Sequence, residues 1–422
     1  MNYFEKKSAD EKKLLERFLR YAKTFSESNS ENAEKGIMPS TLQQKEFATS
    51  LANELESLGL QKVCVTEFSY VYGILPASEN CENAETFCLL SHLDTVDEVS
   101  GKNVVPIVHE NYDGKKITLK DGVSLDVKND CALANCAERR DTIITSSGTT
   151  LLGADDKAGI AEIVSAIEFL QTHKEISHGA IEIIFSPDEE TGHGMDKVPK
   201  HLLQSKYAFT VDGGNLGELE CECFNAVGTT VHFFGKATHT GSARNGGMLN
   251  AIEMVSKFIS LLPHRELPET TDNREGFFAP MEITGSIERS SVYLLLRDFD
   301  ETKLEERKAM VEKLAEATAL SFHGSFFVEH KNQYRNMKKF IDEHKSIIDN
   351  LHEAYKRANV EARFTAIRGG TDGARLSEMG IPTPNIFTGG HNFHSKAEWA
   401  SLFEMCKACD VLVNLAQIVA GF

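Results

Sequence analysis

Two apolar runs of strand length flank one amphipathic segment, and this alternation constrains the fold more than any other feature of the chain. Residues 87–90 and 181–185 are continuous apolar runs, which is typical of strands buried on both faces. Between them, residues 157–170 place Ile160 and Ile163 on one stripe with a helical period. Alternating helices and apolar strands predict an α/β fold, with a mixed, mostly parallel sheet flanked by helices.

The pattern changes after about residue 222, which predicts a second unit inserted into the first. Strands and helices follow in a β-α-β-β-α-β-like order, with segments at about 227–237, 249–262, 290–299, 301–320 and 323–332. This order is typical of an open-faced, ferredoxin-like α+β unit that leaves a sheet face or edge free for dimerisation. From about Met337 the first pattern returns. We therefore predict a catalytic domain at 1–222 and 336–422, and an inserted lid and dimerisation domain at 223–335.

Net charge and apolar runs restrict where the chain acts and what it binds. The 422 residues carry a formal net charge of −18, which argues against nucleic acid because a binder of phosphates needs a basic surface. No run approaches the roughly 20 apolar residues of a membrane span. The charged N-terminal segment also lacks the apolar core of a signal peptide. We expect a cytoplasmic protein that binds neither nucleic acid nor membranes.

The nine cysteines are predicted to be reduced. Their number is odd and they are scattered along the chain, and disulfides are rare in cytoplasmic proteins. Cys221 with Cys223 and Cys406 with Cys409 are closely spaced pairs, and the second pair lies in an apolar stretch typical of a buried helix. Because buried cysteine behaves as a small hydrophobic residue, we expect packing rather than metal binding at both pairs.

Five short fragments place side chains that bind metals just after predicted strands. These fragments are LLSHLDT, LLGADDKAG, FSPDEETG, TVDGG and FHSKAEW. Together they supply two imidazoles and several carboxylates without a cysteine, a ligand set that suits a pair of divalent ions such as zinc. Ligands of open α/β sheets bind beyond the carboxyl ends of the strands, so the fragments are expected to converge. Paired ions activate one shared water in many hydrolases, and the fragments therefore predict a hydrolase.

Each fragment also has a simpler explanation when it is taken alone. An extended backbone puts His92 and Asp94 on the same side, so His92 can bind metal while Asp94 braces its imidazole. Asp155 and Asp156 follow a predicted strand at 149–153. Aspartate there also favours a helix N-cap, so one of the two can cap while the other bridges two ions.

The second acidic pair and the remaining ligands are ambiguous in the same way. Glu189 and Glu190 point in different directions in an extended loop, which fits one carboxylate on metal and one free to accept a proton from water. Two exposed acids can equally be solvated surface groups. Asp212 precedes two glycines, which is also typical of a turn, and His394 competes with His391 as a ligand. The presence of all five fragments together favours the metal site.

The chain resembles the peptidase T family, bacterial tripeptide aminopeptidases among the co-catalytic zinc peptidases. The likeness runs nearly end to end and is most specific in TTLLGADDKAGIAEI, FSPDEETG, YAFTVDGGNLGELE, LLLRDFD, IRGGTDGARLSEMGIP and PNIFTGGHNFH. The resemblance implies two zinc ions per subunit, bound by a first histidine, a bridging aspartate, the second glutamate of a pair, a later aspartate and a final histidine. In this chain these residues are His92, Asp155, Glu190, Asp212 and His394.

The resemblance also implies roles in catalysis and substrate binding. Asp94 matches the bracing carboxylate and Glu189 matches the general base. His239 in GKATHTG matches a lid histidine, often supplied by the other subunit of a dimer, that helps to bind the reacting carbonyl. Arg368 in IRGG corresponds to an arginine that holds the carboxylate of the substrate.

Other positions are less specific or depart from the family pattern. Arg297 and Asn250 match substrate-binding positions, although each also has a structural explanation. His239 stands in His-Thr-Gly rather than His-Pro-Gly, and the segment VDEV after Asp94 lacks a proline. Residues 121–142 and the loop GHGMDKV also look unlike the family. No ligand is lost, but these loops can shape the choice of substrate.

We therefore predict a homodimeric metallo-aminopeptidase that releases the N-terminal residue of short peptides, tripeptides in particular, through a hydroxide bridging two zinc ions. Glu189 would carry the proton of the water to the leaving amine, and zinc with His239 would stabilise the oxyanion. Arg368 would bind the free carboxylate. Manganese or cobalt are alternatives to zinc. Dipeptidase, carboxypeptidase and N-acyl amino acid hydrolase activities fit the same site, and a metal-binding scaffold without turnover is the non-enzyme alternative.

Overall fold

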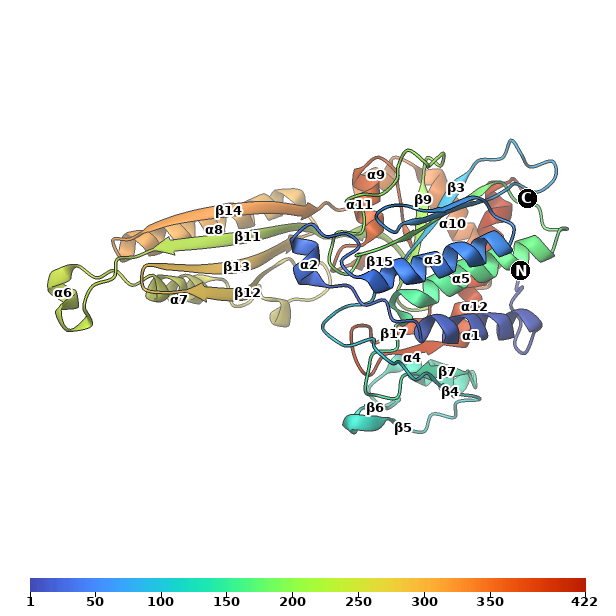
Figure 1. Cartoon of the computed structure of the whole chain (residues 1–422), viewed down its shortest axis with the longest axis horizontal. Helices are drawn as coiled ribbons and strands as arrows, with labels where there is room; N and C mark the ends of the chain where they lie inside the picture. Colours follow the sequence, from blue (N-terminus) through green and yellow to red (C-terminus); the bar gives the residue numbers. More distant parts are fainter. The chain divides into compact units, whose positions relative to one another are not determined.

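The computed structural model describes residues 1–422, and the chain divides into two compact units (Figure 1). The first unit comprises Met1–Cys221, Met337–Thr365 and Thr371–Phe422, and the second comprises Glu222–Asn336 and Ala366–Gly370. The second unit is thus an insertion, joined by one short segment from the C-terminal part of the chain. The lid and dimerisation roles of residues 223–335 stay predictions.

An eight-stranded mixed sheet forms the centre of the first unit, which confirms the predicted fold class. Its order is β1 (Gln61–Val65), β2 (Val71–Leu75), β8 (Ile181–Ser186), β3 (Phe87–His92), β9 (Ala208–Gly213), β16 (Asn385–Phe387), β10 (Glu218–Cys223) and β15 (Arg363–Ile367). β3 is parallel to β8 and β9, and β16 is parallel to β9. β2 and β10 pair antiparallel with β8 and β16. The apolar strands β3 and β8 are buried along their whole length.

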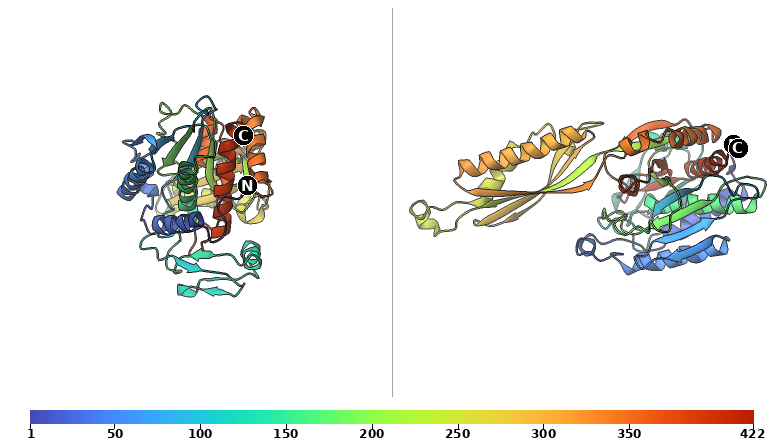
Figure 2. Two further views of the ribbon diagram at one scale, coloured as in Figure 1. Left: turned by 90° about the vertical axis from the view of Figure 1, so that its right-hand side faces the viewer. Right: turned by 90° about the horizontal axis from the view of Figure 1, so that it is seen from above.

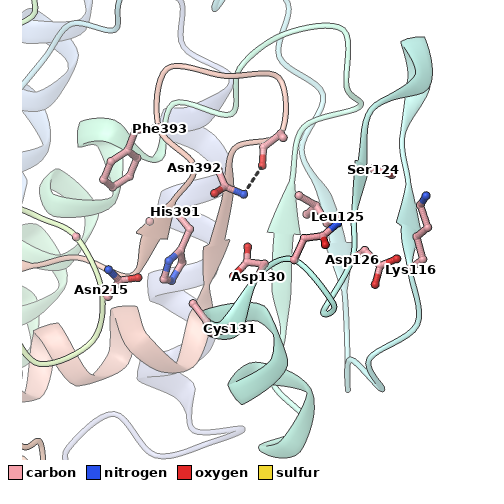
Figure 3. Close-up of a pocket in the computed structure, with 15 residues that line it drawn as sticks. Lys116, Ser124, Leu125, Asp126, Asp130, Cys131, Asn215, His391, Asn392 and Phe393 are labelled. Carbon is pink, nitrogen blue, oxygen red and sulfur yellow. Dashed lines mark hydrogen bonds between the residues drawn. The ribbon is translucent and has the colours of Figure 1, made fainter. Parts of the chain in front are cut away.

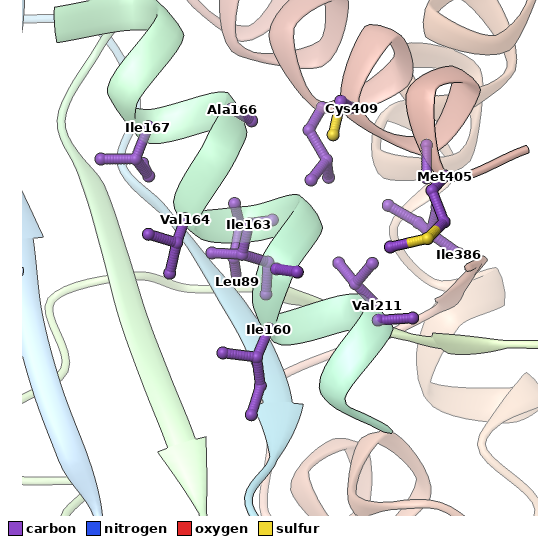
Figure 4. Close-up of a cluster of buried hydrophobic side chains, with 14 of the residues drawn as sticks. Leu89, Ile160, Ile163, Val164, Ala166, Ile167, Val211, Ile386, Met405 and Cys409 are labelled. Atoms are coloured by element: carbon purple, nitrogen blue, oxygen red, sulfur yellow. The ribbon is translucent and has the colours of Figure 1, made fainter. Parts of the chain in front are cut away.

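Helices cover one face of this sheet and enclose the main core (Figures 1 and 2). These helices are α1 (Ala9–Ala22), α3 (Leu42–Ser57), α5 (Ala154–Thr172), α10 (Lys345–Arg357) and α12 (Leu402–Val419). The predicted apolar stripe of α5 packs against β3, β9 and α12, as Figure 4 shows for Ile160, Ile163, Val164, Ile167, Leu89, Val211 and Met405. Cys406 and Cys409 are buried in α12, and all nine cysteines are free thiols.

The opposite face of the sheet carries a smaller core. Side chains that alternate with those of the main core, such as Tyr72, Leu90 and Ile184, pack there with Met195 and Leu376. The latter belongs to α11 (Asp372–Glu378), and the remaining short helices of the unit are α2 (Ser30–Glu34), α4 (Cys131–Glu138) and α9 (Lys338–Asp342). No helix is both long enough and apolar enough to cross a membrane.

Two small antiparallel sheets extend the first unit. One has the order β17 (Gly390–His391), β18 (Trp399–Ser401), β7 (Ile143–Thr145) and β4 (Ile107–His109), and the other pairs β5 (Ile117–Thr118) with β6 (Ser124–Leu125). The first of these sheets therefore joins the segment before Asp155 to the segment around His394.

The second unit has the predicted ferredoxin-like order. Its elements are β11 (Asn225–Phe234), α6 (Ala243–Gly246), α7 (Ala251–Leu261), β12 (Phe277–Gly285), β13 (Arg289–Asp298), α8 (Glu301–Ser321) and β14 (Ser325–Tyr334). The antiparallel sheet has the order β12-β13-β11-β14. α7 and α8 pack on one face of it around an apolar core of their own.

Candidate metal centre

The five predicted ligand residues converge at one edge of the central sheet. His92 ends β3, Asp212 lies near the end of β9, and Glu190 follows β8. Asp155 stands at the beginning of α5, and His394 follows the short strand β17. Residues that are far apart in sequence meet here because parallel strands end at the same edge.

Asp155 contacts both candidate ligand histidines, His92 and His394, through its carboxylate. Nε2 of His92 lies 2.8 Å from Oδ1 of Asp155, and Nε2 of His394 lies 3.1 Å from Oδ2. Asp212 Oδ1 lies 3.6 Å from His92 Nε2, and Glu190 Oε2 lies 3.1 Å from His394 Nε2. Two groups of possible ligands, His92–Asp155–Asp212 and Asp155–Glu190–His394, therefore share one carboxylate. A carboxylate shared in this way is able to bind two neighbouring cations, one through each oxygen.

The charges of this cluster fit bound cations. Burial raises the pKa of Asp212 to about 6 and that of Glu190 to about 8. Hydrogen bonds to Asp155 and Glu190 raise the pKa of His394 to about 11. Burial lowers the pKa of His92, but Asp212 and Asp155 outweigh that effect and raise it well above its usual value. Oε1 of Glu190 is also buried without a hydrogen-bond partner. Metal ions would displace these protons, because only deprotonated ligands bind them.

Asp94 connects the first ligand to the acidic pair. Its carboxylate accepts the backbone N–H groups of Glu189 at 3.0 Å and Glu190 at 3.1 Å. Its Oδ1 lies 3.5 Å from Nδ1 of His92, while its backbone carbonyl oxygen lies closer, at 3.0 Å from the same nitrogen. The carbonyl is therefore the nearer acceptor for a proton on Nδ1, and the carboxylate mainly holds the acidic loop.

Glu189 belongs to neither ligand group and stands beside both. Burial raises its pKa well above the usual value. The preceding residue, Asp188, fixes this loop to the start of α3 by accepting the backbone N–H of Ser40 at 2.8 Å and Nε2 of Gln44 at 2.7 Å. Gln44 Oε1 accepts the N–H of Asp188 in return, at 2.9 Å. The sequence gives no sign of this anchor, because its two halves are far apart in the chain.

The segment before Asp155 is a loop, so the strand predicted at 149–153 is wrong. The backbone N–H groups of Leu152 and Gly153 donate to Oε2 of Glu398, at 2.7 and 2.8 Å. The N–H of Asp155 donates to Oε1 of the same side chain at 3.1 Å. A neighbouring strand cannot use N–H groups that a carboxylate already holds.

Asp156 has the capping role that the sequence left open between the two aspartates. Its Oδ1 accepts the N–H of Gly159 at 3.2 Å, and its Oδ2 accepts the N–H of His92 at 3.1 Å and the hydroxyl of Ser91. The peptide bond between Asp155 and Asp156 is cis. Asp156 thus holds the backbone of β3 to α5, while Asp155 faces the histidines.

His391, the alternative to His394, has a structural role. Its Nε2 pairs with Glu404 at 2.8 Å, and its ring stacks on Trp399 with 3.9 Å between centroids. These contacts hold His391 in the core, and the structure brings His394 to the cluster instead.

A pocket of about 660 Å³ adjoins the loops that carry two of the ligands (Figure 3). Asn215, just after Asp212, and Phe393, just before His394, line it. Residues 124–126 and 129–132, around β6 and at the start of α4, line another part of the pocket, and they belong to the region 121–142 that looks unlike the resembled family.

The four predicted substrate residues lie in the second unit, and each has partners there. Arg368 donates from Nη1 to the carbonyls of Asn273 and Glu275 at 3.0 and 2.9 Å, and from Nη2 to Thr271 Oγ1 at 2.9 Å. Its guanidinium also lies over the Phe224 ring. Both terminal nitrogens are therefore engaged with backbone or hydroxyl oxygens.

The other three residues show simpler contacts. His239 is exposed, and its Nδ1 accepts the N–H of Gly241 at 3.1 Å. Asn250 caps α7 by accepting the N–H of Ile252 at 3.0 Å. Arg297 is buried and donates to the Leu296 carbonyl at 3.1 Å. Helix capping and core packing account for Asn250 and Arg297, and the substrate roles of all four residues stay predictions.

Comparison with known proteins places this centre in a family. A family model for peptidase family M20/M25/M40 matches residues 152–418, a range that holds four of the five candidate ligands. The chain belongs to this peptidase family. This member of the M20/M25/M40 family is 45% identical to peptidase T of Listeria innocua over 408 residues. The aligned residues cover 96% of this chain and 98% of that protein.

Solved structures share the fold of this family member. An aminopeptidase PepT from Bacillus cereus has a TM-score of 0.72 at 23% identity and covers 97% of this chain and 99% of that chain. A tripeptidase from Staphylococcus aureus has a TM-score of 0.75 at 21% identity, covering 97% and 98%. A dinuclear metal-binding M20 peptidase from Bacillus subtilis has a TM-score of 0.66 at 14% identity, again covering 97% and 98%.

Proposed function

We propose that the chain is a metallo-aminopeptidase that removes the N-terminal residue of short peptides, tripeptides in particular. The observation that carries this proposal is the pair of ligand groups that share Asp155, with Glu189 beside them and outside both. The 45% identity to a peptidase T over nearly the whole chain supports the substrate class. The names of the structural neighbours, an aminopeptidase and a tripeptidase, agree with it.

The donor set fits two divalent cations, which we propose to be zinc. His92 and Asp212 would hold one ion and Glu190 and His394 the other, with Asp155 between them. Imidazole and carboxylate ligands suit zinc and also accept manganese or cobalt. Bound cations supply a polarised water and positive charge for the carbonyl oxygen.

Glu189 is the residue of this chain that would move the proton. Its carboxylate would accept a proton from the attacking water and deliver it to the amine that leaves. Burial raises the pKa of Glu189, and two bound cations would oppose this rise by favouring the ionised carboxylate that accepts the proton. The backbone N–H of Glu189 donates to Asp94, and Gln44 donates to Asp188, and these bonds would keep the loop of this base in place during the reaction.

Arg368 and His239 are the proposed contacts from the second unit. Arg368 would recognise the free carboxylate of the peptide, since guanidinium pairs with carboxylate through two parallel hydrogen bonds. Its Nη1 and Nη2 already donate to Thr271, Asn273 and Glu275, so such a pair would share the guanidinium with these contacts. His239 is exposed and would polarise the reacting carbonyl.

A panel of related peptides tests the proposal. We expect a free tripeptide to lose its N-terminal residue, an N-acetylated tripeptide to be inert, and a chelator to abolish cleavage. Measured divalent metal should approach two ions per chain. Release of the C-terminal residue would indicate a carboxypeptidase, and release of acetate would indicate an acylase. Full activity after removal of the metal would refute the metal-dependent mechanism.

We also propose a homodimer formed through the second unit. The large apolar side chains Met281 and Ile283 of β12 and Phe327 of β14 are exposed on the two edge strands of its sheet. Exposed apolar groups on strand edges are typical of surfaces that pair with another chain. Sedimentation of the wild type and of Ile283→Lys tests this, and a monomeric wild type would refute it.

A further inference from the structure

Glu398 is a buried acid that joins the loops of two metal ligands. Its side chain is 1% exposed and lies on the same loop as His394. One oxygen accepts the N–H groups of Leu152 and Gly153 at 2.7 and 2.8 Å, and the other accepts the N–H of Asp155 at 3.1 Å. Glu398 thus connects the loop that carries His394 with the loop that precedes Asp155, although the two loops are far apart in the sequence.

The loop that precedes Asp155 is not held by pairing with a neighbouring strand. It lies outside every strand, and Gly153 adopts a left-handed conformation with a φ of 82°. Three neighbouring N–H groups that point into a buried space need an acceptor, because an unpaired buried donor costs about 1–3 kcal/mol. Hydrogen bonds from N–H groups to a carboxylate are shorter and stronger than those to a neutral acceptor.

We propose that Glu398 is a positioning residue that sets the orientation of Asp155, so that one oxygen of Asp155 faces His92 and the other faces His394. The proposal rests on the two-metal centre proposed above. Glu398 binds the backbone N–H groups of the loop that precedes and includes Asp155, and it would act on the Asp155 carboxylate through that backbone. Residues that orient metal ligands in this way typically change metal affinity by about 10- to 100-fold when they are replaced.

Glu398 could instead only support the loop that carries His394. The two roles make different predictions, because Asp155 is shared by both ligand groups. Asp155 belongs to both ligand groups, whereas His394 belongs to one. Loss of the Glu398 contacts should therefore weaken both metal sites together. Loosening of the His394 loop alone should weaken one site and leave the group of His92, Asp155 and Asp212 intact.

The test is a titration of Glu398→Gln with zinc and cobalt in competition with a chelating dye. We expect both affinities to fall at least about 10-fold, the cobalt absorption spectrum to change, and turnover to recover in part at high metal concentration. Glu404→Gln is the matched control, because Glu404 is also buried (3% exposed) but binds His391 and Arg139 instead of the turn. His394→Ala serves as the one-site reference.

Several outcomes would overturn the inference. These are wild-type affinities in Glu398→Gln, an equal loss in Glu404→Gln, or a loss confined to one site as in His394→Ala. If circular dichroism shows that Glu398→Gln is unfolded, Glu398→Asp replaces it, since it keeps the charge but withdraws the carboxylate from the turn. That variant should also lose affinity at both sites. A wild type that binds fewer than two ions would instead refute the proposed function.

Discussion

Glu162 lies within α5 in the main core, and its carboxylate has no partner. The residue is 0% exposed, and neither of its side-chain oxygens makes a hydrogen bond. Burial raises its pKa well above the usual value, and the charge of Asp156 adds to the rise. We predict that Glu162→Met, which keeps the length of the side chain and removes its polar atoms, stabilises the protein.

The size of the effect depends on pH in a defined direction. Because the pKa is raised on folding, the folded state keeps a proton that the unfolded chain releases above about pH 4.3, the usual glutamate value. Stability of the wild type is therefore lost as the pH rises, by up to about 1.4 kcal/mol per pH unit. The methionine variant lacks this loss. The difference in unfolding free energy between the methionine variant and the wild type should grow by up to about 2.7 kcal/mol between pH 5 and pH 7. This growth adds to a gain of about 1–3 kcal/mol from removing the unpaired buried polar group.

Urea unfolding of both proteins at pH 5, 6 and 7, in the same metal-containing buffer, measures this difference. Other titrating groups are common to the two proteins and cancel in the comparison. Glu162→Gln, which cannot ionise but keeps two polar atoms, should show the same pH trend with a smaller gain. A difference in unfolding free energy that does not change with pH, or a less stable methionine variant, would refute the reasoning.

Three further predictions concern the reaction. Glu189→Gln should retain both metal ions and lose activity by about 100-fold or more; metal analysis beside a tripeptide assay checks this, and undiminished turnover would exclude Glu189 as the base. Arg368→Ala should raise the KM for free tripeptides but not for amidated ones, and an unchanged KM in both series would remove its proposed role. Gln44→Ala should lower kcat without loss of metal, since it frees the loop of Asp188; reduced metal content would instead show that Gln44 supports a ligand.

Local patterns were sufficient to predict the framework of the fold. The apolar strands β3 and β8 and the stripe of α5 fix which faces are buried, and the sequence spacing alone reveals both properties. Strand ends then explain why His92 and Asp212 approach one another. The order of strands and helices in the second unit was likewise predictable from the alternation of polar and apolar residues along the sequence.

Contacts over long sequence separations were not predictable in this way. Residues 149–153 have a strand-like sequence, but their N–H groups bind Glu398, which stands far along the chain. Ser40 and Gln44 hold Asp188 in a similar manner. Such acceptors leave no local signal, because any acid or amide on a distant loop can serve. For Arg368, the motif predicts a role in substrate binding but does not reveal the backbone carbonyls in the second unit to which the side chain donates.

The strand order also bears on how the molecule matures during synthesis. β16, from the C-terminal part of the chain, lies between β9 and β10 in the finished sheet. A nascent chain that ends before residue 385 therefore cannot complete the sheet, and one that ends before residue 394 also lacks the last candidate ligand. A polypeptide that ends before residue 394 accordingly lacks one member of the second ligand group, and its metal centre is incomplete.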